Sequence, residues 1–474
     1  MNKLALHGDL LDFEATPAWG DPALHGVRWR PDHWLLIEDG RIAGTLPGRE
    51  PPGEDWRREE HSGRLLMPGF IDTHVHCPQL DVIASWSPGL LHWLDTYTFP
   101  AEQRFADPEV AAAGAGLFLD ALLAHGTTSA VVFPTVHAAS AEALFAAASA
   151  RGMRLVAGKV LMDRGAPPAL TDDVAGAERD CETLIARWHG QGRNAYAVTV
   201  RFAITSTPEQ LAMAGRLLAR HEGLYLQTHV AENRDEVAEV ARLFPEARSY
   251  LDVYHRHGLL GPRSVLAHGI WLDDEDRRLL AATGAQIAFC PTSNLFLGSG
   301  LFDWQAAMAH GHKVSIATDV GGGTSLSMQR TLAEGYKVQA LRGTQLTAWR
   351  ALHAATRGAA EALGLGAEIG HFDVGATADV VAWDWAHGAA ASHRDAVARG
   401  AVASLPAQDL HARVFAWMTL ADERNVAAAW VAGVPRFERG RMLQNVDIGT
   451  ALATRPDPRD PQHADGADVR SRHS

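Results

Sequence analysis

The middle of the chain alternates two hydrophobic patterns. Between residues 66 and 365, short apolar runs are separated by Ala- and Leu-rich segments with helical spacing, such as 108–125 and 209–221. The eight apolar runs fall at 66–76, 129–136, 154–162, 195–205, 224–229, 264–268, 286–290 and 314–319. Eight strand–helix repeats predict an α/β fold, a (β/α)8 barrel of the TIM type, whose functional residues lie at the carboxyl ends of the strands.

Both ends of the chain carry a β pattern instead. Residues 34–44 have the pattern of a hairpin with an Asp-Gly turn. A similar β-strand pattern occurs at 374–383 and, more weakly, at 425–433. We therefore expect one small β domain built from both chain ends. The predicted division is 1–65 and 366–453 for the small β domain, 66–365 for the barrel, and 454–474 for a disordered tail poor in apolar residues.

Composition and charge narrow the class of partner. The 474 residues are 47% hydrophobic, and 43 Lys and Arg against 56 Asp and Glu give a net charge of −13. Nucleic acids and anionic membranes both need a clustered positive surface, so neither is an expected partner. Residues 121–141 carry no formal charge, but Gly, Pro and His interrupt them, which indicates a buried strand with its flanks rather than a membrane span.

The cysteines favour a reducing compartment. Cys77, Cys181 and Cys290 are odd in number, far apart and in no C-x-x-C pair, so we expect no disulfide framework and a cytoplasmic location. The apolar run at the N-terminus is too short for a signal peptide.

Polar side chains stand at the ends of the predicted strands. They are His74 and His76 on the first strand, His229 on the fifth with Glu232 just beyond it, His268 on the sixth, and Asp319 on the eighth. Residues two apart on a strand face the same side, so both imidazoles of the first strand can face one point at the barrel mouth. Three imidazoles and one carboxylate suit a divalent transition metal such as zinc or iron. With 24 histidines in the chain, any single one is a weak signal, and the ordered set carries the prediction.

These motifs resemble a known superfamily. PGFIDTHVH at 68–76, the later His229 and His268, and ATD at 317–319 look like the amidohydrolase superfamily. Further segments resemble the guanine deaminase family within it. They are Pro78-Gln79, WLDTYTFP at 93–100, GKVLMD at 158–163, VRFA at 200–203 and HVAE at 229–232. The resemblance extends from about residue 30 to 450, and the segment at 93–100 is its most specific part.

The resemblance implies one metal and a hydrolytic deamination of guanine to xanthine. The implied metal ligands are His74, His76, His229 and Asp319, with Zn²⁺ as the expected ion and Fe²⁺ as the alternative. Asp319 would also accept a proton from the attacking water, and His268 would hold and polarise that water. Glu232 would protonate the purine ring nitrogen and then help the amine leave.

The resemblance also implies a purine site. Gln79, Arg201 and Phe202 would shape it, while Trp93 and Phe99 would line or cover it, or else pack as ordinary loop aromatics. An arginine offers only hydrogen-bond donors, so Arg201 can bond the carbonyl oxygen of guanine but not the amino group of adenine. The alternative is that Arg201 pairs with an acidic neighbour and only supports the barrel.

Several alternatives stay open at this point. Lys159 is read as structural or salt-bridged rather than as a carboxylated lysine bridging two metals, and Cys77 and Cys290 are read as small buried hydrophobes. The second candidate function is deamination of another amino-purine, a pterin or a triazine, and a remote third is a non-catalytic barrel scaffold. We expect a homodimer, although the sequence does not decide the oligomeric state.

Overall fold

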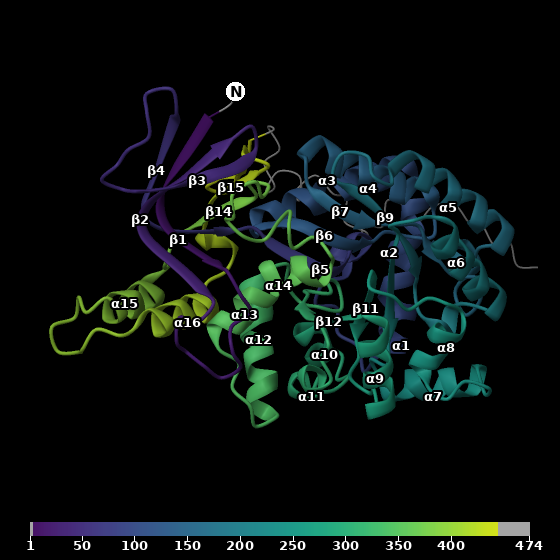
Figure 1. Cartoon of the computed structure of the whole chain (residues 1–474). Helices are drawn as coiled ribbons and strands as arrows, with labels where there is room; N and C mark the ends of the chain where they lie inside the picture. The colour runs from purple at the N-terminus through teal and green to yellow at the C-terminus, as the bar shows by residue number, and fades with distance from the viewer. Residues whose placement is uncertain (1–2, 444–474) are drawn as a thin grey trace, which may run out of the picture.

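The chain forms a barrel and a separate small sheet (Figure 1). The structure, a computed structural model, describes residues 3–443. The predicted tail at 454–474 lies outside the described residues. In Figure 1 the purple strands of the N-terminal end stand beside the yellow-green strands of the C-terminal end, so both chain ends contribute to the small sheet as expected.

The eight predicted barrel strands are all present and parallel. They are β5 (Phe70–His76), β6 (Thr127–Phe133), β7 (Arg154–Ala157), β9 (Asn194–Val200), β10 (Tyr225–Val230), β11 (Ser264–His268), β12 (Gln286–Phe289) and β13 (Val314–Ile316). A short strand, β8 (Val160–Leu161), pairs with β9. The chain therefore has the (β/α)8 architecture that the pattern predicts.

The first and last barrel strands meet at a seam that hydrogen bonds close. The backbone N–H of Asp319 donates to the carbonyl of His74 (2.9 Å), and the N–H of His76 donates to the carbonyl of Val320 (2.7 Å). The buried carboxylate of Asp72 accepts from the backbone N–H (3.1 Å) and the hydroxyl (2.5 Å) of Thr318. The seam therefore brings the end of β5 next to the end of β13.

Helices surround the barrel and follow its strands. They are α3 (Pro108–Ala124), α4 (Ala138–Arg151), α5 (Val174–Trp188), α6 (Pro208–Arg220), α7 (Arg234–Leu243), α8 (Tyr250–Arg256), α9 (Asp274–Thr283), α10 (Pro291–Phe296), α11 (Trp304–Ala309), α12 (Met328–Leu341), α13 (Ala348–Ala354) and α14 (Arg357–Ala362). The predicted helices at 108–125 and 209–221 correspond to α3 and α6 within one residue. Both begin with a capping side chain, Asp107 or Thr207, followed by proline.

The uncharged segment 121–141 is not a membrane span. It contains the end of α3, the whole of β6 and the start of α4. Among residues 3–443, no helix combines the length and the apolar character needed to cross a bilayer.

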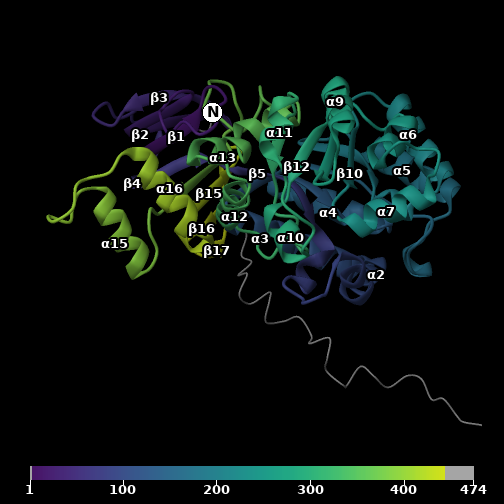
Figure 2. The same cartoon turned by 90° about the horizontal axis from the view of Figure 1, so that it is seen from below.

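The small sheet has the strand order β17-β16-β15-β14-β4-β1-β2-β3. Its strands are β1 (Lys3–Phe13), β2 (Val27–Glu38), β3 (Arg41–Pro47), β4 (Arg57–Pro68), β14 (Val380–Trp383), β15 (Val426–Val431), β16 (Val434–Glu438) and β17 (Arg441–Met442). The predicted hairpin turn is present between β2 and β3, where Asp39 and Gly40 have φ of 49° and 80°. Two helices that the pattern did not predict, α15 (Ala389–Ala398) and α16 (Leu410–Leu420), lie between β14 and β15 in the chain and pack on each other (Figure 2).

The first apolar run, predicted as one strand at 66–76, is two strands in two sheets. Residues up to Pro68 belong to β4 and pair with β14, whereas β5 starts at Phe70 in the barrel. Gly69 lies between them against β6, where a Cβ atom would be 2.2 Å from the hydroxyl oxygen of Thr128. The division at residue 65 stays a prediction, but β4 runs three residues past it.

Replacing Gly69 by alanine is expected to lower the free energy of unfolding by about 1–3 kcal/mol, the usual cost of extra volume in a packed interior. Thr128 is buried and its branched side chain is short, so it cannot swing aside. Denaturant unfolding of Gly69→Ala beside Gly261→Ala, where an added Cβ meets nothing within 4 Å, measures the difference. Equal stability of the two variants would contradict this close approach.

Candidate active site

Four of the predicted side chains converge at the carboxyl end of the barrel. Oδ1 of Asp319 lies 3.1 Å from Nε2 of His74 and 3.3 Å from Nε2 of His76. Nε2 of His76 lies 3.3 Å from Nε2 of His74 and 3.2 Å from Nε2 of His229. The side chains of His74, His76 and Asp319 are at most 8% exposed. One point therefore has three imidazole nitrogens and a carboxylate oxygen around it.

The donor set fits a single tetrahedral metal ion. All four donor atoms lie within 4.8 Å of one another. Ligands about 2.0–2.1 Å from a zinc ion stand roughly 3.4 Å apart at the corners of a tetrahedron, close to the separations measured here. Nδ1 of His229 lies 2.6 Å from the carbonyl oxygen of Arg201, and a hydrogen bond there orients Nε2 toward the cluster.

The surroundings of the histidines and of Asp319 favour the protonation states that bind a metal. Burial lowers the pKa of His76 to about 3 and the pKa of His229 well below its usual value, so both imidazoles are neutral. Burial alone would raise the pKa of Asp319, but the imidazoles around it, His74 first, hold that pKa well below its usual range. Neutral imidazole and ionised carboxylate are the protonation states that bind a metal.

The backbone is strained where the site is built. Ala231, His268 and Asp319 have φ of 47°, 71° and 50°, a left-handed conformation that residues other than glycine seldom adopt. Hydrogen bonds from neighbouring strands hold these positions, among them the one from Asp319 to His74. Such strain concentrates at functional sites, where the surrounding fold fixes a side chain in a required direction.

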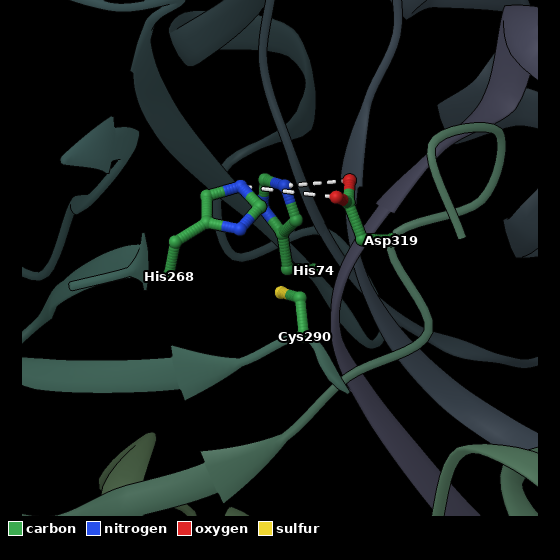
Figure 3. Close-up of side chains that lie close together, drawn as sticks. All are labelled: His74, His268, Cys290 and Asp319. Atoms are coloured by element: carbon green, nitrogen blue, oxygen red, sulfur yellow. Dashed lines mark ion pairs between the residues drawn. The ribbon is translucent and has the colours of Figure 1, made fainter. Parts of the chain in front are cut away.

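Glu232 and His268 stand beside the donor set. Nε2 of His268 lies 3.5 Å from Oε2 of Glu232 and 3.7 Å from Oδ2 of Asp319; Figure 3 shows the second of these contacts. Burial, and next the charge of Asp319, raise the pKa of Glu232 to about 8, so this carboxyl group carries a proton at neutral pH. It is therefore poised as an acid.

Two residues that the sequence did not single out hold this pair. The hydroxyl of Ser299 donates to Oε1 of Glu232 (2.9 Å), and Oδ1 of Asn294 lies 2.8 Å from Nδ1 of His268. Both come from the segment after β12 and are buried. They fix which oxygen of Glu232 and which nitrogen of His268 face the cluster.

Cys290 lies close enough to join an alternative donor set with His74, His268 and Asp319 (Figure 3). Burial raises its pKa well above the usual value, and Sγ donates to the carbonyl of Ala288 (3.3 Å). A neutral thiol bonded to the backbone is not the ligand form, so the set with three imidazoles is the better metal site. Cys77 is also buried among core residues, in the 3₁₀ segment η1 (Cys77–Val82).

Lys159 takes no part in the pocket. Its fully buried ammonium lies 2.6 Å from Oδ2 of Asp172. This ion pair is consistent with the structural or salt-bridged role expected for Lys159.

A cavity opens beside the donor set. It is lined by His76, Gln79, Leu90, Trp93, Leu94, Arg201, Phe202, His229, Glu232, His268, Leu297, Asp319 and Gly322. One wall comes from the segment after β5, which contains α1 (Leu90–Trp93), the π-helical η2 (Leu94–Thr98) and α2 (Phe99–Gln103) and projects from one end of the barrel (Figure 2). Trp93 lines the cavity, whereas Phe99 is absent from the lining.

Phe99 instead lies against Arg201. The guanidinium carbon of Arg201 is 5.4 Å from the centroid of the Phe99 ring. Both side chains are at most 4% exposed. Phe99 therefore packs behind the pocket wall and does not line the cavity.

Arg201 lies between the cavity and a buried carboxylate. It lines the cavity, and its Nη1 also donates to both carboxylate oxygens of Glu102, at 2.8 and 2.7 Å. Gln79 joins the same carboxylate, because its Nε2 donates to Oε1 of Glu102 (3.1 Å). The sequence analysis missed Glu102; it stands two residues after the segment at 93–100, but a lone glutamate gives no sign that it will be buried.

The chain belongs to the amidohydrolase family, whose model matches residues 65–436. It is 40% identical over 446 residues to guanine deaminase of Escherichia coli K12, covering 92% of this chain and 98% of that protein. Human guanine deaminase is 32% identical over 369 residues, which cover 74% of this chain and 81% of that protein.

Solved structures show the same similarity. The structure of the Escherichia coli guanine deaminase superposes with a TM-score of 0.86 and covers 93% of this chain and all of its own. A crystal structure of guanine deaminase from C. acetobutylicum with bound guanine in the active site gives a TM-score of 0.81 at 25% identity, over 92% of this chain and 100% of its own.

Proposed function

We propose that this chain catalyses the hydrolytic deamination of guanine to xanthine and ammonia. The observation that carries the proposal is the cavity, whose lining combines His76, His229 and Asp319 of the donor set with Glu232, Arg201 and Gln79. The similarity to guanine deaminases over nearly the whole chain supports the choice of substrate.

His74, His76, His229 and Asp319 would hold one divalent metal, Zn²⁺ in our proposal, with Fe²⁺ as the alternative. When bound, such a metal lowers the pKa of a water molecule and so provides a nucleophile near neutral pH. Asp319 can serve in two ways, because Oδ1 faces His74 and His76 while Oδ2 faces His268. Its Oδ2 is the atom placed to accept a proton from the attacking water, and His268 would hold and polarise that water.

Glu232 would move the remaining protons. In its protonated state it donates to the ring nitrogen next to the carbon that bears the amino group, which makes that carbon more electrophilic. The carboxylate left behind can then take up the proton that Asp319 accepted from the water and pass it to the departing amine. The proton of the hydroxyl group on the attacked carbon returns to Glu232 as the carbonyl of xanthine forms. The hydroxyl of Ser299 keeps the carboxyl group directed into the cavity during both transfers.

Arg201 and Gln79 would select guanine. The guanidinium of Arg201 can donate to the carbonyl oxygen at position 6, whereas adenine offers an amino group there and would face Arg201 donor to donor. Sites built to bond a substrate group reject an analogue without it by about 10⁴–10⁵ in kcat/KM. Gln79, Phe202 and Trp93 complete the purine-binding walls in this proposal.

Ammonia release from guanine, measured with metal analysis of the same sample, tests the proposal directly. Parallel assays with adenine, a pterin and a triazine address the second candidate function. Faster release from one of these than from guanine would replace the proposed substrate. A metal-loaded sample that releases ammonia from none of them would favour a non-catalytic barrel.

Replacing Arg201 by alanine is expected to lower kcat/KM for guanine by about 10- to 100-fold or more, because a charged hydrogen-bond donor to the substrate is lost. Metal content should not change, since Arg201 contributes only its backbone carbonyl to the donor set. Arg151→Ala is a matched control, because Arg151 pairs with Asp120 between α3 and α4 on the outside of the barrel. Unchanged guanine kinetics in Arg201→Ala would remove this side chain from the substrate site.

We further propose that the enzyme works as a homodimer in the cytoplasm, with guanine rather than a nucleic acid or a membrane as its partner. The acidic net charge of −13 supports the choice of a small substrate. Sedimentation velocity tests the homodimer, and a monomeric species at working concentration would overturn it.

A further inference from the structure

A carboxylate with no direct role in the chemistry lies behind the purine-binding wall. Glu102 sits on α2, and its side chain is fully buried. Its two oxygens accept three hydrogen bonds: two from Nη1 of Arg201 and one from Nε2 of Gln79. Glu102 is absent from the cavity lining, so it touches the substrate-facing side chains without facing the substrate.

These contacts fix the direction of both partners. Among residues 3–443, the hydrogen bonds of the Arg201 side chain all leave from Nη1, so its other donors stay available to a bound base. The Gln79 amide is held at both ends, because Nε2 donates to Glu102 and Oε1 accepts from the N–H of Gly321 (3.1 Å). Both residues can therefore present only one pattern of donors to the cavity.

We infer that Glu102 is a positioning residue that sets selectivity for the 6-carbonyl of guanine by orienting Arg201 and Gln79. The inference rests on the function proposed above. It assigns the selectivity for the 6-carbonyl to a residue that does not line the cavity. Without the carboxylate, the buried guanidinium of Arg201 loses the counter-charge in contact with it, while the ring of Phe99 stays 5.4 Å away. The guanidinium is then free to turn away from the position of the carbonyl oxygen.

Two inhibitors isolate this effect. Hypoxanthine carries the carbonyl at position 6 and purine does not, and neither has the 2-amino group that the reaction removes. The ratio of their inhibition constants against guanine deamination therefore measures how much the 6-carbonyl contributes to binding. Glu102→Gln is expected to reduce the wild-type preference for hypoxanthine by roughly 10- to 100-fold, the worth of one charged hydrogen bond. It should also raise KM for guanine more than it lowers kcat.

Two further variants separate positioning from general damage. Glu102→Asp keeps the negative charge but withdraws the oxygens by one methylene group, so the preference should fall there too even if Glu102→Gln does not fold. In an Arg201→Met background, Glu102→Gln should change the ratio less than it does in the wild type, because two residues that act as one unit are not additive. Asp120→Asn is the matched control: it removes another buried carboxylate paired with an arginine, away from the cavity, and should leave the ratio unchanged.

The outcomes are distinct. A folded, metal-loaded Glu102→Gln or Glu102→Asp enzyme with the wild-type ratio overturns the inference, as does full additivity with Arg201→Met. A wild-type enzyme that deaminates guanine but binds purine as well as hypoxanthine also overturns it and leaves the proposed function standing. Absence of ammonia release from guanine by the wild type overturns the proposed function itself.

Discussion

Replacing either His229 or Asp319 by alanine is expected to remove the metal and nearly abolish ammonia release from guanine. Each variant deletes one of four donors whose separations match a single tetrahedral ion. The remaining three would bind far more weakly, and the nucleophile is lost with the metal. Metal content by atomic emission and initial rates on the same samples measure both effects.

A buried histidine away from the site gives the control. His371 is 3% exposed, and its Nε2 lies 2.8 Å from the carbonyl oxygen of Gly366. His371→Ala therefore costs stability without touching the donor set, and it should keep its metal. Full occupancy with near-normal turnover in both His229→Ala and Asp319→Ala would refute the assignment of the ligands.

Glu232→Gln is expected to keep the metal and the fold but to lose about 10²–10⁴ in rate, the usual worth of a positioned acid–base group. Glutamine has nearly the same shape and can still accept from Ser299, but it cannot donate and retrieve an acidic proton. The pKa of about 8 that burial gives Glu232 makes the proton available at neutral pH in the wild type.

Metal analysis distinguishes this role from ligation. Loss of metal from Glu232→Gln would show that Glu232 is a ligand. Glu142→Gln serves as the comparison, because Glu142 bonds Trp188 and Arg187 on the outer helices and should leave the rate unchanged.

The sequence was most informative where local pattern and chemistry coincide. Each barrel strand is a short apolar run. His76 and His268 are the last residues of β5 and β11, and His229 is the last residue but one of β10. Side chains at the carboxyl ends of barrel strands meet at the same end of the barrel, independently of the helices between the strands. That rule predicts which side chains converge without any knowledge of distances.

Positions that depend on distant parts of the chain were harder to predict. The run at 66–76 looks like one strand, since nothing local shows that Pro68 will pair with β14, more than 300 residues away. Glu102 and Ser299 are ordinary polar residues in their own segments and become significant only when the fold places Arg201 and Glu232 beside them. Their roles follow from tertiary contacts that the sequence pattern does not encode.

A metal ion bound at the seam of the barrel would make the lifetime of the folded chain depend on the supply of that ion. His74 and Asp319 lie on opposite sides of that seam, so an ion held by both would act as a staple across the first and last strands. A ligand that binds only the folded state stabilises it by mass action, by about 2.7 kcal/mol when its free concentration is one hundred times its dissociation constant. A cell short of the ion would therefore lose activity and also hold a larger pool of partly opened barrels exposed to proteolysis.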